Sequence, residues 1–106
     1  MPTYITLFNW TDQGIRNVRD TVEQVDRGAE LAEEKYGMRL GQIYWTVGPY
    51  DLVSVFEASD DESMSAFLLE LGSAGNVRST TLRAYDREEI SEITGGSRKR
   101  EGLTEA

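Results

Sequence analysis

The sequence predicts an α+β domain in which strands and helices follow one another in the order βαββαβ. Two observations indicate this order: two strand-like runs separated by a short turn lie in the middle of the chain, and each side of them carries one further strand and one helix. The turn is Gly48-Pro49-Tyr50-Asp51, within the segment from Tyr44 to Phe56. β-branched and aromatic residues favour strands, while proline and aspartate suit a turn. The middle of the chain is therefore predicted to be a β-hairpin.

A first strand is predicted over residues 4–10, and a long helix follows it. Apolar residues recur there at alternating spacings of three and four, which places them on one face of a helix. They are Ile15, Val18, Val22, Val25, Ala29, Ala32 and Tyr36. Gly37 comes directly afterwards, where a glycine commonly ends a helix. The spacing predicts one continuous helix of about six turns.

A second helix is predicted after the hairpin, with Ser59 capping its first turn and Glu62 reaching back to complete a capping box. Its apolar stripe consists of Met64, Phe67, Leu68 and Leu71. A last strand, rich in Thr, Val and Tyr, is predicted over residues 77–85. The complete order is the ferredoxin-like split βαβ arrangement, a four-stranded antiparallel sheet with two helices on one face.

Length and composition are those of one small domain. The chain has 106 residues, 39% of them hydrophobic, which is enough for one modest core. We expect the domain to span residues 1–86 and residues 87–106 to form a short, partly disordered extension. This extension carries the basic run Arg98-Lys99-Arg100, which is interpreted as part of a solvated tail.

Residue usage excludes several classes of function. The chain contains no cysteine and no histidine, which excludes disulfides and haem or zinc sites built on those residues. Its formal charge of −8, from 19 acidic and 11 basic residues, disfavours binding to nucleic acid phosphates. No signal-peptide pattern or membrane-spanning apolar run is present. We expect a cytoplasmic protein without cofactor or metal that does not bind membranes.

Apolar residues occupy both faces of the predicted sheet. Ile5 and Leu7 of the first strand alternate with Tyr4, Thr6, Phe8 and Trp10, and Val53 and Val55 of the third strand alternate with Leu52, Ser54 and Phe56. Both sets are substantially apolar. Because both helices cover one face, a monomer would expose a wide apolar patch on the other. The pattern therefore predicts a homodimer in which two sheets pack face to face.

Residues 43–57, the following Ser-Asp-Asp-Glu run and residues 71–84 together resemble the GYD-domain family. The Gly-x-Tyr-Asp signature falls on Gly48, Tyr50 and Asp51, and a Gly-Asn-Val-Arg run falls on residues 75–78. The resemblance covers about residues 3 to 86 and implies a dimeric α/β barrel. It implies little about activity, and it does not extend to the residues after Asp86.

The chain is also similar to the effector domains of the leucine-responsive regulators, which carry a Gly-x-Tyr-Asp turn at the same place. That resemblance implies pairing through the sheets and binding of amino acids or other small molecules. The helix-turn-helix that normally precedes such domains is missing from this sequence, so we expect no direct transcriptional control.

Several residues are candidates for a ligand site. Tyr50 and Asp51 could contact a polar small molecule, although turn chemistry alone explains these residue types and is favoured. Arg78 and Arg83 could bind an anion. An ion pair with a carboxylate is favoured for Arg78, whereas Arg83 shares its parity with Thr81 and Tyr85 and is expected to face the barrel interior.

The aromatic residues permit a second kind of site. Trp10, Tyr44, Trp45 and Phe56 could line an apolar cavity, with Asn9, Thr46 and Ser54 as its polar groups. The alternative is that these aromatics belong to the core and the dimer interface. We therefore assign Tyr50, Asp51, Arg83, Tyr44 and Trp10 as candidate ligand-binding residues.

Two functions are compared here, and a purely structural interaction partner stays open as a third. The first is a homo-oligomeric module for small-molecule binding or assembly. The second is an enzyme similar to cofactor-independent monooxygenases, acting on an aromatic or apolar substrate in the barrel cavity. A base in such an enzyme would have to be Asp51, Glu57 or a tyrosinate with a strongly shifted pKa, so the non-catalytic function is favoured. The acidic run Asp60-Asp61-Glu62 suits a helix N-terminus and predicts no metal site.

Overall fold

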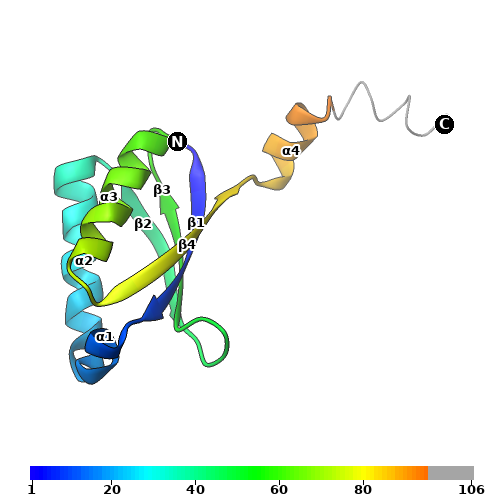
Figure 1. The fold of residues 1–106 in the computed structure, drawn as a ribbon. Coiled ribbons are helices and arrows are strands. Elements are labelled where there is room, and N and C mark those ends of the chain that lie inside the picture. Colours follow the sequence, from blue (N-terminus) through cyan, green and yellow to red (C-terminus); the bar gives the residue numbers. More distant parts are fainter. Residues whose placement is uncertain (96–106) are drawn as a thin grey trace.

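Four strands form one antiparallel sheet in the computed structural model, which describes residues 1–95. The strands stand in the order β2-β3-β1-β4, and the two long helices α2 and α3 both cover the same face (Figure 1). The strands are β1 (Thr3–Trp10), β2 (Arg39–Trp45), β3 (Leu52–Glu57) and β4 (Val77–Ala84), and the long helices are α2 (Thr21–Tyr36) and α3 (Asp61–Ser73). The predicted ferredoxin-like architecture is confirmed.

The register of the sheet assigns each strand residue to one face. Tyr4 of β1 lies opposite Phe56 of β3 and Arg83 of β4, while Ile5 lies opposite Val55. Even-numbered residues of β1 and β3 are buried beneath the helices, and odd-numbered residues lie on the uncovered face. The fully buried hydrophobic core consists of Tyr4, Phe8, Ala32, Met38, Leu52, Phe56, Ala58, Met64 and Phe67.

The predicted continuous helix over residues 15–36 is divided into three pieces, so that prediction was wrong in its extent. A short helix α1 (Asp12–Arg16) and a 3-10 turn η1 (Val18–Asp20) precede α2. Asn17 separates them with a non-helical backbone (φ −103°, ψ 19°). Because the axis changes here, the apolar stripe is not continued: Ile15 and Val22 are 48% and 59% exposed.

The hairpin is confirmed, but its connection is longer than predicted. β2 ends at Trp45 and β3 begins at Leu52, which leaves residues 46–51 as the loop. The pairing of β2 with β3 also shifts by one residue between Leu40 and Gln42. At the intervening Gly41, an added Cβ would lie 3.4 Å from the carbonyl oxygen of Val55. The bulge therefore occurs where the strands approach closely.

The predicted cap of α3 was wrong by one residue. Asp60, rather than Ser59, is the N-cap, and its carboxylate accepts the backbone N–H of Ser63 at 2.8 Å. This hydrogen bond, which satisfies an otherwise free N–H of the first turn, lowers the pKa of Asp60. The hydroxyl of Ser59 lies 3.5 Å from that of Ser63 instead.

The C-terminal extension begins with a helix, α4 (Arg87–Ile93), which Figure 1 shows standing away from the sheet. A capping box heads it: Asp86 accepts the Glu89 backbone N–H, and the Glu89 side chain accepts the Asp86 N–H. The rest of the predicted disordered extension, with Arg98-Lys99-Arg100, lies outside the described residues.

Candidate functional site

The Gly-Pro-Tyr-Asp turn is held by hydrogen bonds to the end of β1. The Asn9 side-chain amide donates to the Pro49 carbonyl oxygen at 2.7 Å. Asp51 binds β1 twice, because its N–H donates to the Phe8 carbonyl oxygen (2.8 Å) and its carboxylate accepts the Trp10 backbone N–H (2.9 Å). These bonds lengthen the sheet past the point where β3 begins. The Asp51 carboxylate therefore has a structural partner.

The same loop is closed on its other side by Thr46. Its N–H donates to the Asp51 carbonyl oxygen at 2.8 Å, and its hydroxyl donates to the Tyr50 carbonyl oxygen at 2.5 Å. The structure thus brings together three of the predicted ligand residues, Trp10, Tyr50 and Asp51, at one end of the sheet. In this loop, Val47 is fully exposed.

Arg83 lies away from that turn, and its predicted position inside a barrel was wrong. It is opposite Tyr4, about four residues and so roughly 14 Å along β1 from Phe8, where Asp51 is bound. Because Tyr4 points toward the helices, Arg83 shares that face. Its guanidinium stacks over the rings of Tyr4 (5.6 Å) and Tyr85 (4.3 Å) and lies 3.9 Å from the Glu89 carboxylate.

The ion pair predicted for Arg78 is not found among residues 1–95. Within residues 1–95, Arg78 has no carboxylate in contact, whereas Arg83 has Glu89 on α4. The sequence could not indicate this pairing because α4 lies in the segment interpreted as an extension. The result is that Arg83 joins the sheet to α4 and is not directed at a ligand cavity.

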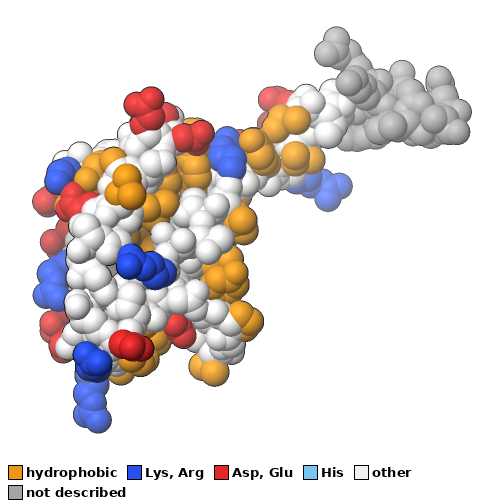
Figure 2. All heavy atoms as spheres, in the orientation of Figure 1, with side chains coloured by type: hydrophobic (Ala, Val, Ile, Leu, Met, Phe, Trp, Pro, Cys, Tyr) orange, Lys and Arg blue, Asp and Glu red, His pale blue; other side chains and the backbone are white. Residues whose placement is uncertain are grey.

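Tyr44 occupies the uncovered side of the sheet, opposite Val53, and is 59% exposed. It belongs to a group of apolar side chains on the odd-numbered positions of β1 and β3 and the positions opposite them. We call this group the open sheet face; it consists of Ile5, Leu7, Tyr44, Val53, Val55 and Leu82. Figure 2 shows hydrophobic side chains gathered on the side of the sheet away from α2 and α3.

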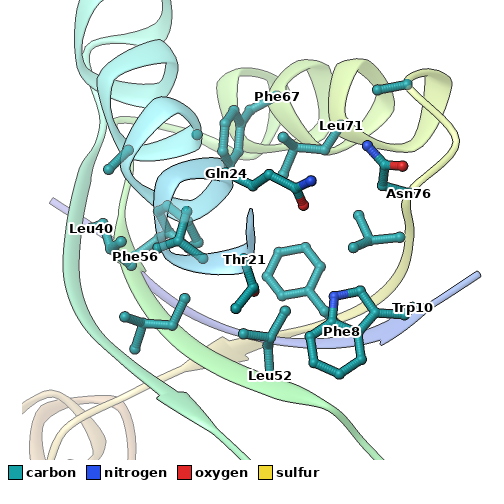
Figure 3. Close-up of a pocket in the computed structure, with 16 residues that line it drawn as sticks. Phe8, Trp10, Thr21, Gln24, Leu40, Leu52, Phe56, Phe67, Leu71 and Asn76 are labelled. Atoms are coloured by element: carbon teal, nitrogen blue, oxygen red, sulfur yellow. The ribbon is translucent and has the colours of Figure 1, made fainter. Parts of the chain in front are cut away.

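The predicted aromatic cavity exists in a different place and with a different lining. A cavity of about 140 Å³ lies between α2, α3 and the sheet, on the helix side (Figure 3). Trp10 and Phe56 line it as predicted, but Tyr44 is on the opposite face. Trp45 does not line it either, and its indole N–H donates to the Thr21 hydroxyl at 2.9 Å. We call this space the helix–sheet cavity.

Sequence reasoning missed the cause of this cavity. Gly28 and Ala29 lie on α2 at the cavity wall, where larger residues would fill the space against the sheet. The signal was present in the stripe itself, since Ala29 and Ala32 are the only small residues in it. No ionisable side chain is among the residues that line the cavity, so its chemistry suits binding better than proton transfer.

The acidic run before α3 has structural partners. Asp60 caps the helix, and Asp61 accepts a hydrogen bond from the Tyr4 hydroxyl. Burial, together with this bond, raises the pKa of Tyr4 to about 12. Among residues 1–95 no cluster of carboxylates has the arrangement of a metal site. None of the helices described there has the length and hydrophobicity needed to cross a membrane.

Comparisons with known proteins agree with this geometry. The model of the GYD domain family matches residues 4–94, which includes α4. A protein of Thermus thermophilus named "Glutamine synthetase and cystathionine beta-lyase binding protein" is 36% identical over 84 residues, which are 79% of this chain and 88% of that protein.

Solved structures show the same fold at lower identity. The structure of MtbAldR matches with a TM-score of 0.63 and 17% identity over 81% of this chain, which spans about half (52%) of that longer protein. Ribosomal protein S6 of Thermotoga maritima matches with a TM-score of 0.54 and 13% identity, over 89% of this chain and 97% of that one. These two likenesses concern the fold alone. From the family match and the Thermus relative together, the chain belongs to the GYD domain family.

Proposed function

We propose that this protein is a homo-oligomeric binding module, in which the open sheet face joins two copies and the assembled particle binds a metabolic enzyme. The observation that carries the assembly step is the apolar character of the open sheet face. The second step rests on the Thermus thermophilus relative, which is named as a binding protein of glutamine synthetase and cystathionine beta-lyase.

The open sheet face carries aliphatic side chains at the centre of the sheet. The helix-covered side contains the buried hydroxyls of Thr6 and Ser54, whereas the positions beside them carry Ile5, Val53 and Val55. Four strands about 4.8 Å apart, each of six to eight residues, give a sheet face of roughly 450 Å² in all. Gln42 and Thr80 also lie on this face, so its apolar part is smaller. Contiguous apolar patches of a few hundred Å² on a monomer are often functional.

Two copies joined through this face would bury those side chains and leave the helices outward. The relevant test is the mass in solution, measured by light scattering after size-exclusion chromatography. We expect a multiple of the 11.9 kDa chain at micromolar concentration. A wild-type mass of one chain would overturn the assembly step.

Val55→Lys is a sharp variant for this test. Val55 lies opposite Ile5 on the uncovered side of a central strand, so a lysine there remains solvated in a monomer but is desolvated between two sheets. We expect Val55→Lys to have the mass of one chain. Ser65→Lys, which adds the same charge at an exposed position of α3, is the matched control and keeps the wild-type mass.

The binding step is tested separately, with purified glutamine synthetase and cystathionine beta-lyase from the source organism. Co-elution of either enzyme with the wild-type protein, confirmed by calorimetry, is the expected result. If both enzymes elute alone while the wild-type mass is that of an oligomer, the enzyme-binding step is wrong and the assembly step stands.

A further inference from the structure

We propose that the helix–sheet cavity binds a small, uncharged, single-ring aromatic molecule that carries one polar substituent. The cavity lies on the opposite side of the sheet from the open sheet face. This inference therefore does not depend on the proposed assembly, and the two are tested by different measurements.

The cavity exists because α2 carries a glycine where the helix faces the sheet. A Cβ added at Gly28 would meet nothing within 4 Å, and its φ is not in the left-handed region. Neither close packing nor backbone geometry requires glycine there, although glycine in a helix interior costs roughly 0.5–1 kcal/mol relative to alanine. Gly28 therefore leaves open space at the wall of the cavity.

The size and lining of the cavity suit one aromatic ring. Protein interiors contain few spaces larger than a water molecule, whereas this one has about 140 Å³. An enclosed apolar cavity of about 150 Å³ is large enough to take up benzene, so the volume here suffices for one ring. The rings of Phe8, Phe56 and Phe67 contribute to the wall, and Phe56 and Phe67 already contact each other edge to face at 5.3 Å. A bound ring would extend this aromatic packing.

Four lining residues carry polar groups: Trp10, Thr21, Gln24 and Asn76. The Thr21 hydroxyl already accepts the Trp45 indole N–H. Figure 3 shows Gln24 from α2 and Asn76, which precedes β4, extending toward the space above the rings, with the Trp10 indole at its edge. Among residues 1–95, the Trp10 indole N–H has no hydrogen-bond partner, unlike that of Trp45. Such a donor favours a ligand hydroxyl or carbonyl oxygen.

The ligand is inferred to be uncharged because no lysine or arginine lines the cavity. A carboxylate would lose its hydration there without gaining a cation, which is strongly unfavourable. This requirement separates the cavity from a site for free amino acids, whose carboxylate and ammonium groups would both need partners.

Phenol and benzoate are the probes, because both have one ring and only benzoate is charged at neutral pH. We would titrate the ¹⁵N-labelled wild-type protein with each and follow the Trp10 indole N–H resonance, assigned with Trp10→Phe. Phenol is expected to give a saturable shift and intermolecular contacts with the Leu52 and Leu71 methyl groups. Benzoate is expected to give neither. No saturable shift with phenol, or equal binding of benzoate, would overturn the proposal.

Gly28→Leu tests the location, since its side chain projects into the cavity from a helix position that tolerates leucine well. We expect it to weaken phenol binding by at least about tenfold. Glu30→Leu, which adds the same side chain at an exposed position of α2, is the control and keeps wild-type affinity. Unchanged affinity in Gly28→Leu would contradict the proposal. If that variant does not fold, the contacts with Leu52 and Leu71 in the wild-type protein decide the location.

Discussion

The same methyl group added at two glycines is predicted to change stability in opposite directions. At Gly14 an added Cβ would lie 1.9 Å from the carbonyl oxygen of Asn76 and 2.9 Å from its carbonyl carbon. Both are backbone atoms, so the clash cannot be relieved by turning a side chain. At Gly28 the same Cβ would meet no atom within 4 Å.

The magnitude for Gly14→Ala follows from what must move. Ordinary contact begins near 3.4 Å, so the backbone of Asn76 would have to shift by about 1.5 Å, as judged by that contact scale. The Asn76 carbonyl also accepts the Thr11 N–H at 3.0 Å, a hydrogen bond of about 0.5–1.5 kcal/mol. With about 1–3 kcal/mol for overpacking, we expect the unfolding free energy to fall by roughly 2–4 kcal/mol.

For Gly28→Ala we expect a gain of roughly 0.5–1 kcal/mol from helix propensity. Urea unfolding of both variants and of the wild type, followed by circular dichroism, measures these differences directly. At about 4–8 °C per kcal/mol for a domain of this size, Gly14→Ala should also melt at least about 8 °C lower. The reasoning is refuted if Gly14→Ala is as stable as the wild type, or if Gly28→Ala loses as much as Gly14→Ala.

Two further predictions concern single hydrogen bonds. Asp60→Ala should lower the unfolding free energy by about 1 kcal/mol, because the cap to Ser63 is lost. Ser59→Ala should stay within about 0.5 kcal/mol of the wild type. Equal losses for the two variants in urea unfolding would count against Asp60 as the cap. Tyr4, whose pKa is raised from 10.0 to about 12 in the folded state, should contribute stability that is fully present below pH 10 and lost as the pH rises through 12. Tyr4→Phe should therefore show a weaker fall in stability across that window, and identical pH profiles for the two proteins would contradict the role of the bond to Asp61.

The fold could be predicted because the hairpin and the two helical stripes use local signals that agree with one another. The division of the predicted first helix into three pieces could not be predicted. Ile15, Val18 and Val22 keep a helical spacing across the break at Asn17, yet tertiary contacts decide the outcome: buried Gly14 brings α1 against the Asn76 backbone. Local periodicity carries no information about that contact.

The candidate site was predicted less well, and the reason lies in the composition of the two sheet faces. The buried face includes Thr6, Ser54 and Thr81, with the Thr6 and Thr81 hydroxyls 3.2 Å apart and the Ser54 hydroxyl donating to the Thr6 carbonyl oxygen. The uncovered face has Ile5 and Val55 at the neighbouring positions. Hydrophobicity alone therefore could not show whether the odd-numbered or the even-numbered strand residues point toward the helices. For this reason Arg83 was expected on the other face of the sheet.

The alternation of side chains between the two sheet faces also links the two proposals. Each strand residue serves one face only, because side chains alternate along a strand, so Val55 and Phe56 lie next to each other in sequence but belong to different sites. A substitution at Val55 changes the surface proposed for assembly and leaves the lining of the helix–sheet cavity in place. The three phenylalanines at the wall of that cavity contribute nothing to the open sheet face. An uncovered face with Ile5, Val53 and Val55 at its centre favours a partner. The hydroxyls of Thr6 and Ser54 are tolerated in the core because each has a hydrogen-bond partner. The two proposals therefore assign one role to each side of the sheet: the open sheet face to assembly and the covered face to the cavity.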